Sequence, residues 1–177
     1  MDKNYILPTH IDPYRYAENA GRLQGRLQLK DMDRLTPSLL ESDGEVAIDV
    51  VFGIDPQGIK YLKGSFETKV TLQCQRCLEP FSLAIHDHLS SGLVRSEEAA
   101  KKLPDHYEPL IVKDDELVIN DMIEDELILS LPIVPMHDAS DCRVKLPVIA
   151  AEVESAVGGA KVNPFKIIES LKSKNKE

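Results

Sequence analysis

Residues 66–85 read FETKVTLQCQRCLEPFSLAI and contain two alternating apolar runs on either side of a Cys-x-x-Cys pair. The run before Cys74 keeps its apolar residues on even positions, and the run after Cys77 keeps them on odd positions. A period of two is typical of strands with one buried face. The sequence therefore predicts two antiparallel strands joined at the cysteines. Their apolar residues are Phe66, Val70, Leu72, Phe81, Leu83 and Ile85.

Similar alternation extends outward from this hairpin. Glu45 to Phe52 alternates, Gly21 to Leu29 has leucines on one parity, and a turn at residues 55–58 leads into Ile59 to Leu62. We expect Gly64 to interrupt the next strand. These patterns predict an α+β fold whose centre, over about residues 21–95, is an antiparallel β-sheet or barrel-like. A further short apolar strand is expected over residues 110–112.

A buried helix is predicted near residues 120–131, with Asn120 as its cap and Pro132 ending it. Its apolar residues surround most of the circumference, so we expect burial on nearly all sides. The acidic side chains Asp121, Glu124, Asp125 and Glu126 suit the positive end of the helix dipole and are expected to be solvated. Neighbouring carboxylates on a helix point in different directions, which argues against a catalytic pair.

A short C-terminal helix is expected to begin at Asn163-Pro164. We predict one globular domain over residues 1–160, followed at 161–177 by this helix and a lysine-rich tail. No stretch approaches the length of a membrane span, and the first residues lack the pattern of a signal peptide. The expected location is the cytoplasm, without membrane association.

Three thiols and one imidazole could form a complete zinc-binding set. Cys74, Cys77, His137 and Cys142 are the candidate ligands, provided that the fold brings residues 74–77 and 137–142 together. Four protein ligands would leave no position for a catalytic water, so the zinc would be structural. Two alternatives remain: a metal-free cluster of partly buried thiols, and redox chemistry at the Cys-x-x-Cys pair.

The net charge of -9 is unevenly distributed. Residues 41–90 carry four basic and eight acidic groups, and residues 91–132 carry four and eleven. RNA binding usually needs several cations, and the best basic segment is the C-terminal tail. We find no phosphate-binding glycine loop, nucleophile elbow or Ser-His-Asp spacing, so neither an enzyme nor a small-molecule substrate is predicted.

The motifs taken together resemble the YceD family, the large ribosomal RNA subunit accumulation proteins. The resemblance is carried by Ile11-Asp12-Pro13, Cys74-Gln-Arg-Cys77 with Glu79-Pro80-Phe81, Tyr107-Glu108-Pro109, residues 124–129, residues 131–135 before His137 and Cys142, and Asn163-Pro164-Phe165 with Leu171-Lys172. It implies a role in the synthesis, processing or stability of 23S ribosomal RNA, and hence in large-subunit assembly, without an established catalytic activity. It also implies suspected metal binding through Cys74, Cys77 and Cys142, with His137 where relatives carry His or Cys.

Two mechanisms would fit such a role. In the first, the protein is an acidic adaptor for a basic ribosomal protein or assembly factor, and the net charge favours this reading. In the second, it binds ribosomal RNA directly. An enzyme that processes ribosomal RNA is the least favoured alternative. The adaptor surface would contain Asp114, Asp115, Glu116 and Asp121, and the RNA surface would contain Arg22, Arg26, Arg76, Lys166, Lys172, Lys174 and Lys176.

Overall fold

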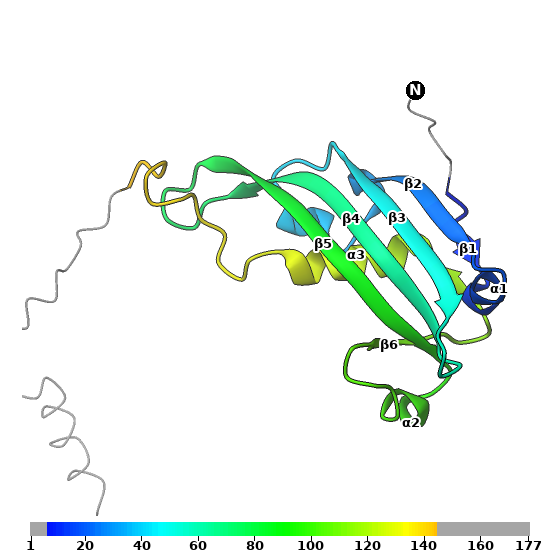
Figure 1. Ribbon diagram of the computed structural model, residues 1–177. Coiled ribbons are helices and arrows are strands. Elements are labelled where there is room, and N and C mark those ends of the chain that lie inside the picture. Colours follow the sequence, from blue (N-terminus) through cyan, green and yellow to red (C-terminus); the bar gives the residue numbers. More distant parts are fainter. Residues whose placement is uncertain (1–6, 145–177) are drawn as a thin grey trace, which may run out of the picture. The chain divides into compact units, whose positions relative to one another are not determined.

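The computed structural model describes residues 7–144, which belong to one compact unit. Its centre is a five-stranded sheet in the order β2-β3-β4-β5-β6 (Figure 1). The strands are β2 (Arg22–Gln28), β3 (Glu45–Ile54), β4 (Lys60–Gln73), β5 (Pro80–Val94) and β6 (Glu108–Ile111). The α+β prediction is confirmed. The sheet is open, with β2 and β6 at its edges, so the barrel-like alternative is wrong.

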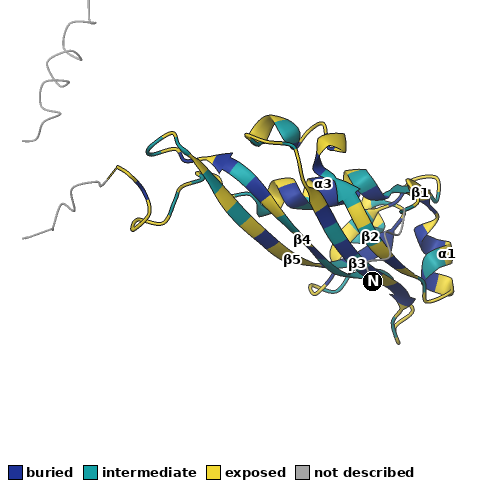
Figure 2. Cartoon of the chain, turned by 90° about the horizontal axis from the view of Figure 1, so that it is seen from above, coloured by how far each residue is buried: buried dark blue, intermediate teal, exposed yellow. Residues whose placement is uncertain are grey.

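The four strands β2 to β5 pair in antiparallel fashion, as the alternating runs predict. Along β3 the side chains of Val46, Ile48, Val50 and Phe52 are buried, while their neighbours face outward. Figure 2 shows the resulting bands of buried and exposed residues along the strands. One face of the sheet therefore supplies the main core, and the other face is largely polar.

The longest pair of strands is β4 and β5, which are joined at the Cys-x-x-Cys loop. Their register runs from Tyr61 opposite Gly92 to Gln73 opposite Pro80. Gly64 does not interrupt β4, contrary to the expectation from its sequence. It lies within the strand opposite Val50, where the backbone of β3 approaches closely.

The edge strand β6 pairs with β5 in parallel, which the alternating pattern did not predict. The connection between β5 and β6 contains the short helix α2 (Glu97–Ala100). A second, two-stranded sheet pairs β1 (His10–Ile11) with β7 (Leu117–Val118). Helix α1 (Pro13–Glu18) follows β1, and two short 3-10 turns, η1 (Leu29–Asp31) and η2 (Thr36–Ser38), lie between β2 and β3.

Helix α3 (Ile119–Ser130) covers the inner face of the sheet (Figure 1). Its position confirms the helix predicted near 120–131, but only one side of it is buried. Ile119, Ile123 and Leu127 lie in the core, whereas Leu129 is 79 % exposed. The expected broad burial is therefore wrong, because the sheet covers one side of the helix only.

The beginning of α3 also differs from the prediction. Val118 occupies the N-cap position, while Asn120 lies inside the helix and donates its side-chain hydrogen bond to the Asp31 carbonyl at 2.9 Å. Glu124 is not solvated, since it is 3 % exposed and pairs with Arg34 at 2.9 Å. A charged residue in the middle of a helix can thus be buried by a distant partner.

The predicted C-terminal helix, the domain boundary near residue 160 and the lysine-rich tail lie outside the described residues. No helix within residues 7–144 is long and apolar enough to cross a membrane.

Candidate metal centre

The loop between β4 and β5 positions the first two candidate ligands. Its ends are closed by the Cys74 amide, which donates to the Glu79 carbonyl at 3.0 Å, and by the Leu78 amide, which donates to the Cys74 carbonyl at 2.9 Å. Leu78 has a φ of 62°, a left-handed conformation that lets the chain turn back into β5. The Arg76 amide points at Cys74 Sγ, 3.5 Å away. The turn thus places a backbone N–H donor beside the sulfur of Cys74.

The second half of the site lies in the segment that follows α3. Gln75 in the hairpin loop donates its amide hydrogen bond to the Pro135 carbonyl at 2.8 Å. An ion pair of 3.0 Å between Arg143 and Glu79 makes a further connection between the two segments. Cys142 is held by its own amide, which donates to the Asp138 carbonyl at 3.1 Å. The segment after α3 is therefore fastened to the hairpin on both sides of His137.

The ligand atoms of Cys74, Cys77, His137 and Cys142 all lie within 4.8 Å of one another. Cys77 Sγ is 3.4 Å from His137 Nδ1, and the ring of His137 packs against Phe81 with centroids 5.2 Å apart. Bond lengths of 2.0–2.3 Å and tetrahedral angles would separate zinc ligands by roughly 3.5–3.8 Å. The expected convergence of the four side chains is confirmed, and the donor set fits zinc.

The surroundings of Cys74 and Cys77 shift the pKa values of their thiols. Burial would raise the pKa of Cys74, but hydrogen bonding with the backbone of Cys77, His137 and Arg76 outweighs it and lowers the pKa to about 5. A backbone hydrogen bond from Glu79 lowers the pKa of Cys77, but burial and the neighbouring thiols Cys74 and Cys142 raise it overall. Without a metal, Cys74 thus ionises more readily than Cys77, and a divalent cation would stabilise the thiolates that ligate it.

The redox alternative fits the geometry less well. Cys74, the thiol with the lowered pKa, is buried, whereas Cys77, the partly exposed thiol that a second thiol could reach, has a raised pKa and forms its thiolate less readily. Cys74 also follows β4 directly in a hairpin loop and does not begin a helix. All three cysteines are free. The arrangement therefore suits a closed structural site better than an exchanging dithiol.

The acidic candidates for a partner surface are not all available. Asp114 and Asp115 lie in the turn between β6 and β7, and Asp115 forms an ion pair with Arg95. Glu116 pairs with His10 at 2.6 Å. Asp121 is exposed in the first turn of α3. Two of the four carboxylates therefore already have cationic or imidazole partners within the chain.

The basic candidates for an RNA surface are also engaged. Arg22 forms an ion pair with Asp49, and Arg26 pairs with Glu45 at 3.2 Å, in each case across the β2–β3 ladder. The guanidinium of Arg76 contacts Met136 Sδ at 3.7 Å. The other candidates, Lys166, Lys172, Lys174 and Lys176, lie outside the described residues.

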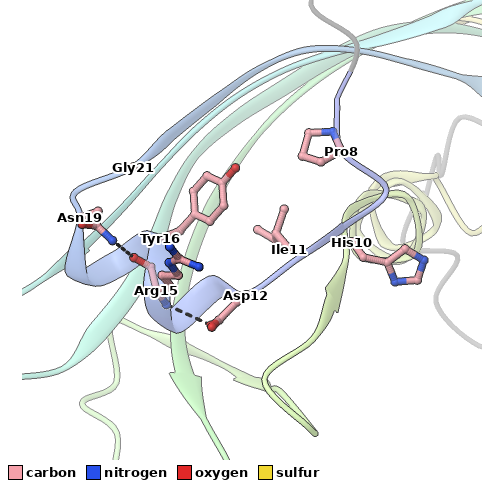
Figure 3. A pocket seen from close by; sticks show the side chains of 8 residues that line it. All are labelled: Pro8, His10, Ile11, Asp12, Arg15, Tyr16, Asn19 and Gly21. Carbon is pink, nitrogen blue, oxygen red and sulfur yellow. Dashed lines mark hydrogen bonds between the residues drawn. The ribbon is translucent and has the colours of Figure 1, made fainter.

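Two cavities lie beside residues of α1. One, of about 410 Å³, lies beside α1 (Figure 3), where the Arg15 amide donates to Asp12 and Asn19 donates to the Arg15 carbonyl. The other, of about 530 Å³, is lined by Tyr14, Lys60 and Arg95. There the two cations pack against the Tyr14 ring while pairing with Glu18 and Asp115. These contacts hold α1 to the end of the sheet.

Sequence reasoning missed the groups that support the cysteine site. Phe81, Pro135 and the Glu79–Arg143 pair contact or position its ligands, although none belongs to a metal-binding motif. The available signal was that Glu79, Phe81 and Pro135 lie in motifs that carry the family resemblance. The remaining contacts depend on how the two segments meet in space.

Comparisons with known proteins agree with the motif pattern. A family model described as "Large ribosomal RNA subunit accumulation protein YceD" matches residues 62–172. A curated protein of that description from Haemophilus influenzae is 31 % identical over 169 residues, which cover 95 % of this chain and 97 % of that protein. No solved structure matches significantly.

Proposed function

Because the chain belongs to the YceD family of large ribosomal RNA subunit accumulation proteins, we propose that it supports the accumulation of large-subunit ribosomal RNA. The similarity extends over nearly the whole of both chains, so the proposal concerns the entire protein. The RNA concerned would be the 23S species, and the process would be assembly of the large subunit.

The protein would act in this process without catalysing a reaction. Among residues 7–144, the cysteine cluster is the only group of three or more potential metal ligands. Four protein ligands close a zinc site and leave no open position for substrate or water. When bound, zinc would supply only a structural crosslink, held by Cys74, Cys77, His137 and Cys142. The free thiols suit a reducing compartment such as the cytoplasm.

An adaptor mechanism is favoured over direct RNA binding. The observation that carries this choice is the pairing of Arg22 and Arg26 with Asp49 and Glu45, which neutralises the two arginines of β2 that were candidates for RNA contact. Residues 41–132 add eight basic against nineteen acidic groups. The net negative charge of these residues would repel a polyanion and attract a basic ribosomal protein or assembly factor. Direct RNA binding through the lysine-rich tail is the second candidate.

A pull-down with and without ribonuclease distinguishes the two mechanisms. Tagged full-length protein would be isolated from lysate at low salt, together with a variant carrying Lys172→Gln, Lys174→Gln and Lys176→Gln. The adaptor mechanism predicts that large-subunit proteins remain bound after ribonuclease treatment and with the variant. Loss of these proteins in both cases, together with RNA affinity that falls steeply with salt, would instead establish direct RNA binding.

The cellular role has its own test. Depletion of the protein should lower the ratio of 23S to 16S ribosomal RNA, and the full-length chain should restore it. An unchanged ratio after complete depletion would contradict the proposal. Turnover of a 23S fragment by the purified protein, abolished by a point substitution, would contradict the non-enzymatic mechanism.

A further inference from the structure

The end of α3 and the segment that follows it expose a concentration of large apolar side chains. Four of them form what we call the apolar ridge, namely Leu129, Ile133, Val134 and Met136, which are 79, 100, 53 and 44 % exposed. Single exposed apolar residues are normal on a protein surface, but such a group within eight residues marks an interaction site. Val134 and Met136 are only half exposed and Met136 contacts Arg76, whereas the exposure of Leu129 and Ile133 needs another explanation.

The ridge is held in place before any partner binds. Leu129 lies in the last turn of α3, on the side away from the buried Ile123 and Leu127. Prolines at 132 and 135 restrict the backbone on both sides of Ile133 and Val134. The Pro135 carbonyl accepts the hydrogen bond from Gln75, which attaches the end of the ridge to the β4–β5 hairpin. A preorganised apolar surface loses little conformational entropy on binding.

The charge around the ridge defines what it can bind. Residues 119–142 contain six acidic side chains and no lysine or arginine. Two arginines lie nearby: Arg143 pairs with Glu79, and Arg76 contacts Met136. Glu124 is buried against Arg34, and Asp125 forms an ion pair with the same arginine. Acidic groups outside that pair include Glu126, Asp138 and Asp141. Burial raises the pKa of Glu126, and the nearby carboxylates of Glu108 and Asp87 raise it further. The ridge therefore has an apolar centre with a mostly acidic rim, and Arg76 is the cation that contacts it at Met136.

We propose that the apolar ridge docks a basic protein segment that carries aliphatic or aromatic anchor residues. This inference rests on the proposed adaptor function and names the surface and the class of partner. Apolar anchors would cover Leu129 and Ile133, and lysine or arginine side chains would meet the carboxylates of the rim. A second copy of the chain fits less well, since a symmetric contact would bring two acidic rims together. RNA would meet the same repulsion.

Binding to a peptide array tests the proposal. The probe is the labelled full-length protein, and the array carries overlapping 15-residue segments of the large-subunit ribosomal proteins from the same organism. We expect binding to segments that combine lysine or arginine with aliphatic or aromatic residues. Ile133→Ser and Leu129→Ser should each weaken binding at least tenfold. The matched control is Ile54→Ser, which replaces a 47 % exposed apolar residue at the end of β3 and should leave binding unchanged.

Several outcomes would overturn the proposal. Equal effects of Ile133→Ser and Ile54→Ser, or equal binding to basic peptides with and without apolar residues, would show that the ridge is not the docking surface. A dimer in sedimentation velocity that Ile133→Ser dissociates would assign the ridge to self-association. Loss of 23S fragment binding in the same variant would assign it to RNA. A photo-crosslinker at position 133 that links only within the chain would show an internal cover.

Failure of this inference and failure of the proposed function give different results. Cells carrying Ile133→Ser would be assayed for the 23S to 16S ratio alongside the array. Peptide binding that depends on Ile133, with a normal ratio in depleted cells, would preserve the docking surface and refute the role in RNA accumulation. A low ratio in depleted cells, with peptide binding that does not depend on Ile133, would preserve the role and refute the docking surface.

Discussion

At the scale of single residues, backbone conformation and hydrogen-bond partners explain features that residue type alone does not. Leu78 shows this for the backbone, since a bulky residue occupies a conformation that glycine usually fills. Glu124 shows it for charge, since a carboxylate in the middle of α3 is buried against Arg34, which lies 90 residues earlier in the chain.

Leu78→Gly should stabilise the zinc-loaded protein. The left-handed conformation is unfavourable by about 1 kcal/mol for a residue with a side chain, and part of the gain is offset by the greater freedom of glycine in the unfolded chain. Leu78 is 64 % exposed, so little packing is lost. We expect a gain of about 0.5 kcal/mol in urea unfolding. Leu78→Ala keeps the strained backbone and should give no gain; equal effects of the two variants would contradict this explanation.

Glu124→Gln should destabilise the protein. Glu124 accepts hydrogen bonds from the amides of Arg34 and Leu35, at 2.6 and 3.0 Å, and from the Arg34 guanidinium. Replacing a buried charge in such a network is expected to lower the free energy of unfolding by about 2–3 kcal/mol at pH 7. Asp125→Asn changes the exposed partner of the same arginine and should cost less than about 1 kcal/mol. Urea unfolding of both variants measures the difference.

The same site predicts how stability depends on pH. Burial alone would raise the pKa of Glu124, but hydrogen bonds from Leu35 and Arg34 lower it below its usual value. Ionised Glu124 therefore makes its full contribution to the free energy of unfolding above the unfolded-state pKa of about 4.3. This contribution is lost as the pH falls through the lower pKa that Glu124 has in the folded protein. Wild-type stability should fall with acidification more steeply than that of Glu124→Gln. Parallel curves for the two proteins would contradict this assignment.

At the scale of elements, the long β4–β5 hairpin carries the cysteine loop beyond the core. The pairing of this hairpin with β3 depends on a close approach between β3 and β4 at Gly64. A Cβ atom there would lie 2.2 Å from the Asp49 carbonyl oxygen and 2.6 Å from Val50 Cα. These are backbone atoms that cannot rotate away, so the absence of a side chain permits the strand pairing.

Gly64→Ala should therefore separate β3 from β4 locally and lower the free energy of unfolding by about 2–3 kcal/mol. Ser65→Ala is the matched control, since the neighbouring residue points to the polar face of the sheet and should change stability by less than about 0.5 kcal/mol. Thermal and urea unfolding would be compared. Equal free energies of unfolding for Gly64→Ala and Ser65→Ala would show that the pairing of β3 with β4 does not require glycine at this position.

At the scale of the whole molecule, the proposed zinc joins two segments that are about 60 residues apart in sequence. Phe66 and Leu127 lie in a core that contains no metal ligand. Metal loss should consequently release the cysteine loop and the segment after α3 while the sheet stays folded.

Chelation or Cys77→Ser should lower the melting temperature by several degrees, because the crosslink stabilises only the folded chain. Native-state hydrogen exchange should then show rapid exchange at residues 74–79 and 131–144, while amides of β3 and β4 remain the most protected. Purified protein should contain one zinc per chain. An unchanged melting curve, with no zinc in the purified protein, would contradict the proposed zinc crosslink.

The amino-acid sequence by itself determined the strands β2 to β5, the existence of α3 and the motifs of the family. Apolar alternation and helix punctuation are local signals, and burial of one face follows directly from them. Only the tertiary structure decided that β6 pairs in parallel, that Glu124 is buried, that Arg22 and Arg26 are neutralised, and that His137 and Cys142 meet the Cys74 hairpin. Each of these depends on which distant segments become neighbours, and residue spacing along the chain does not contain that information.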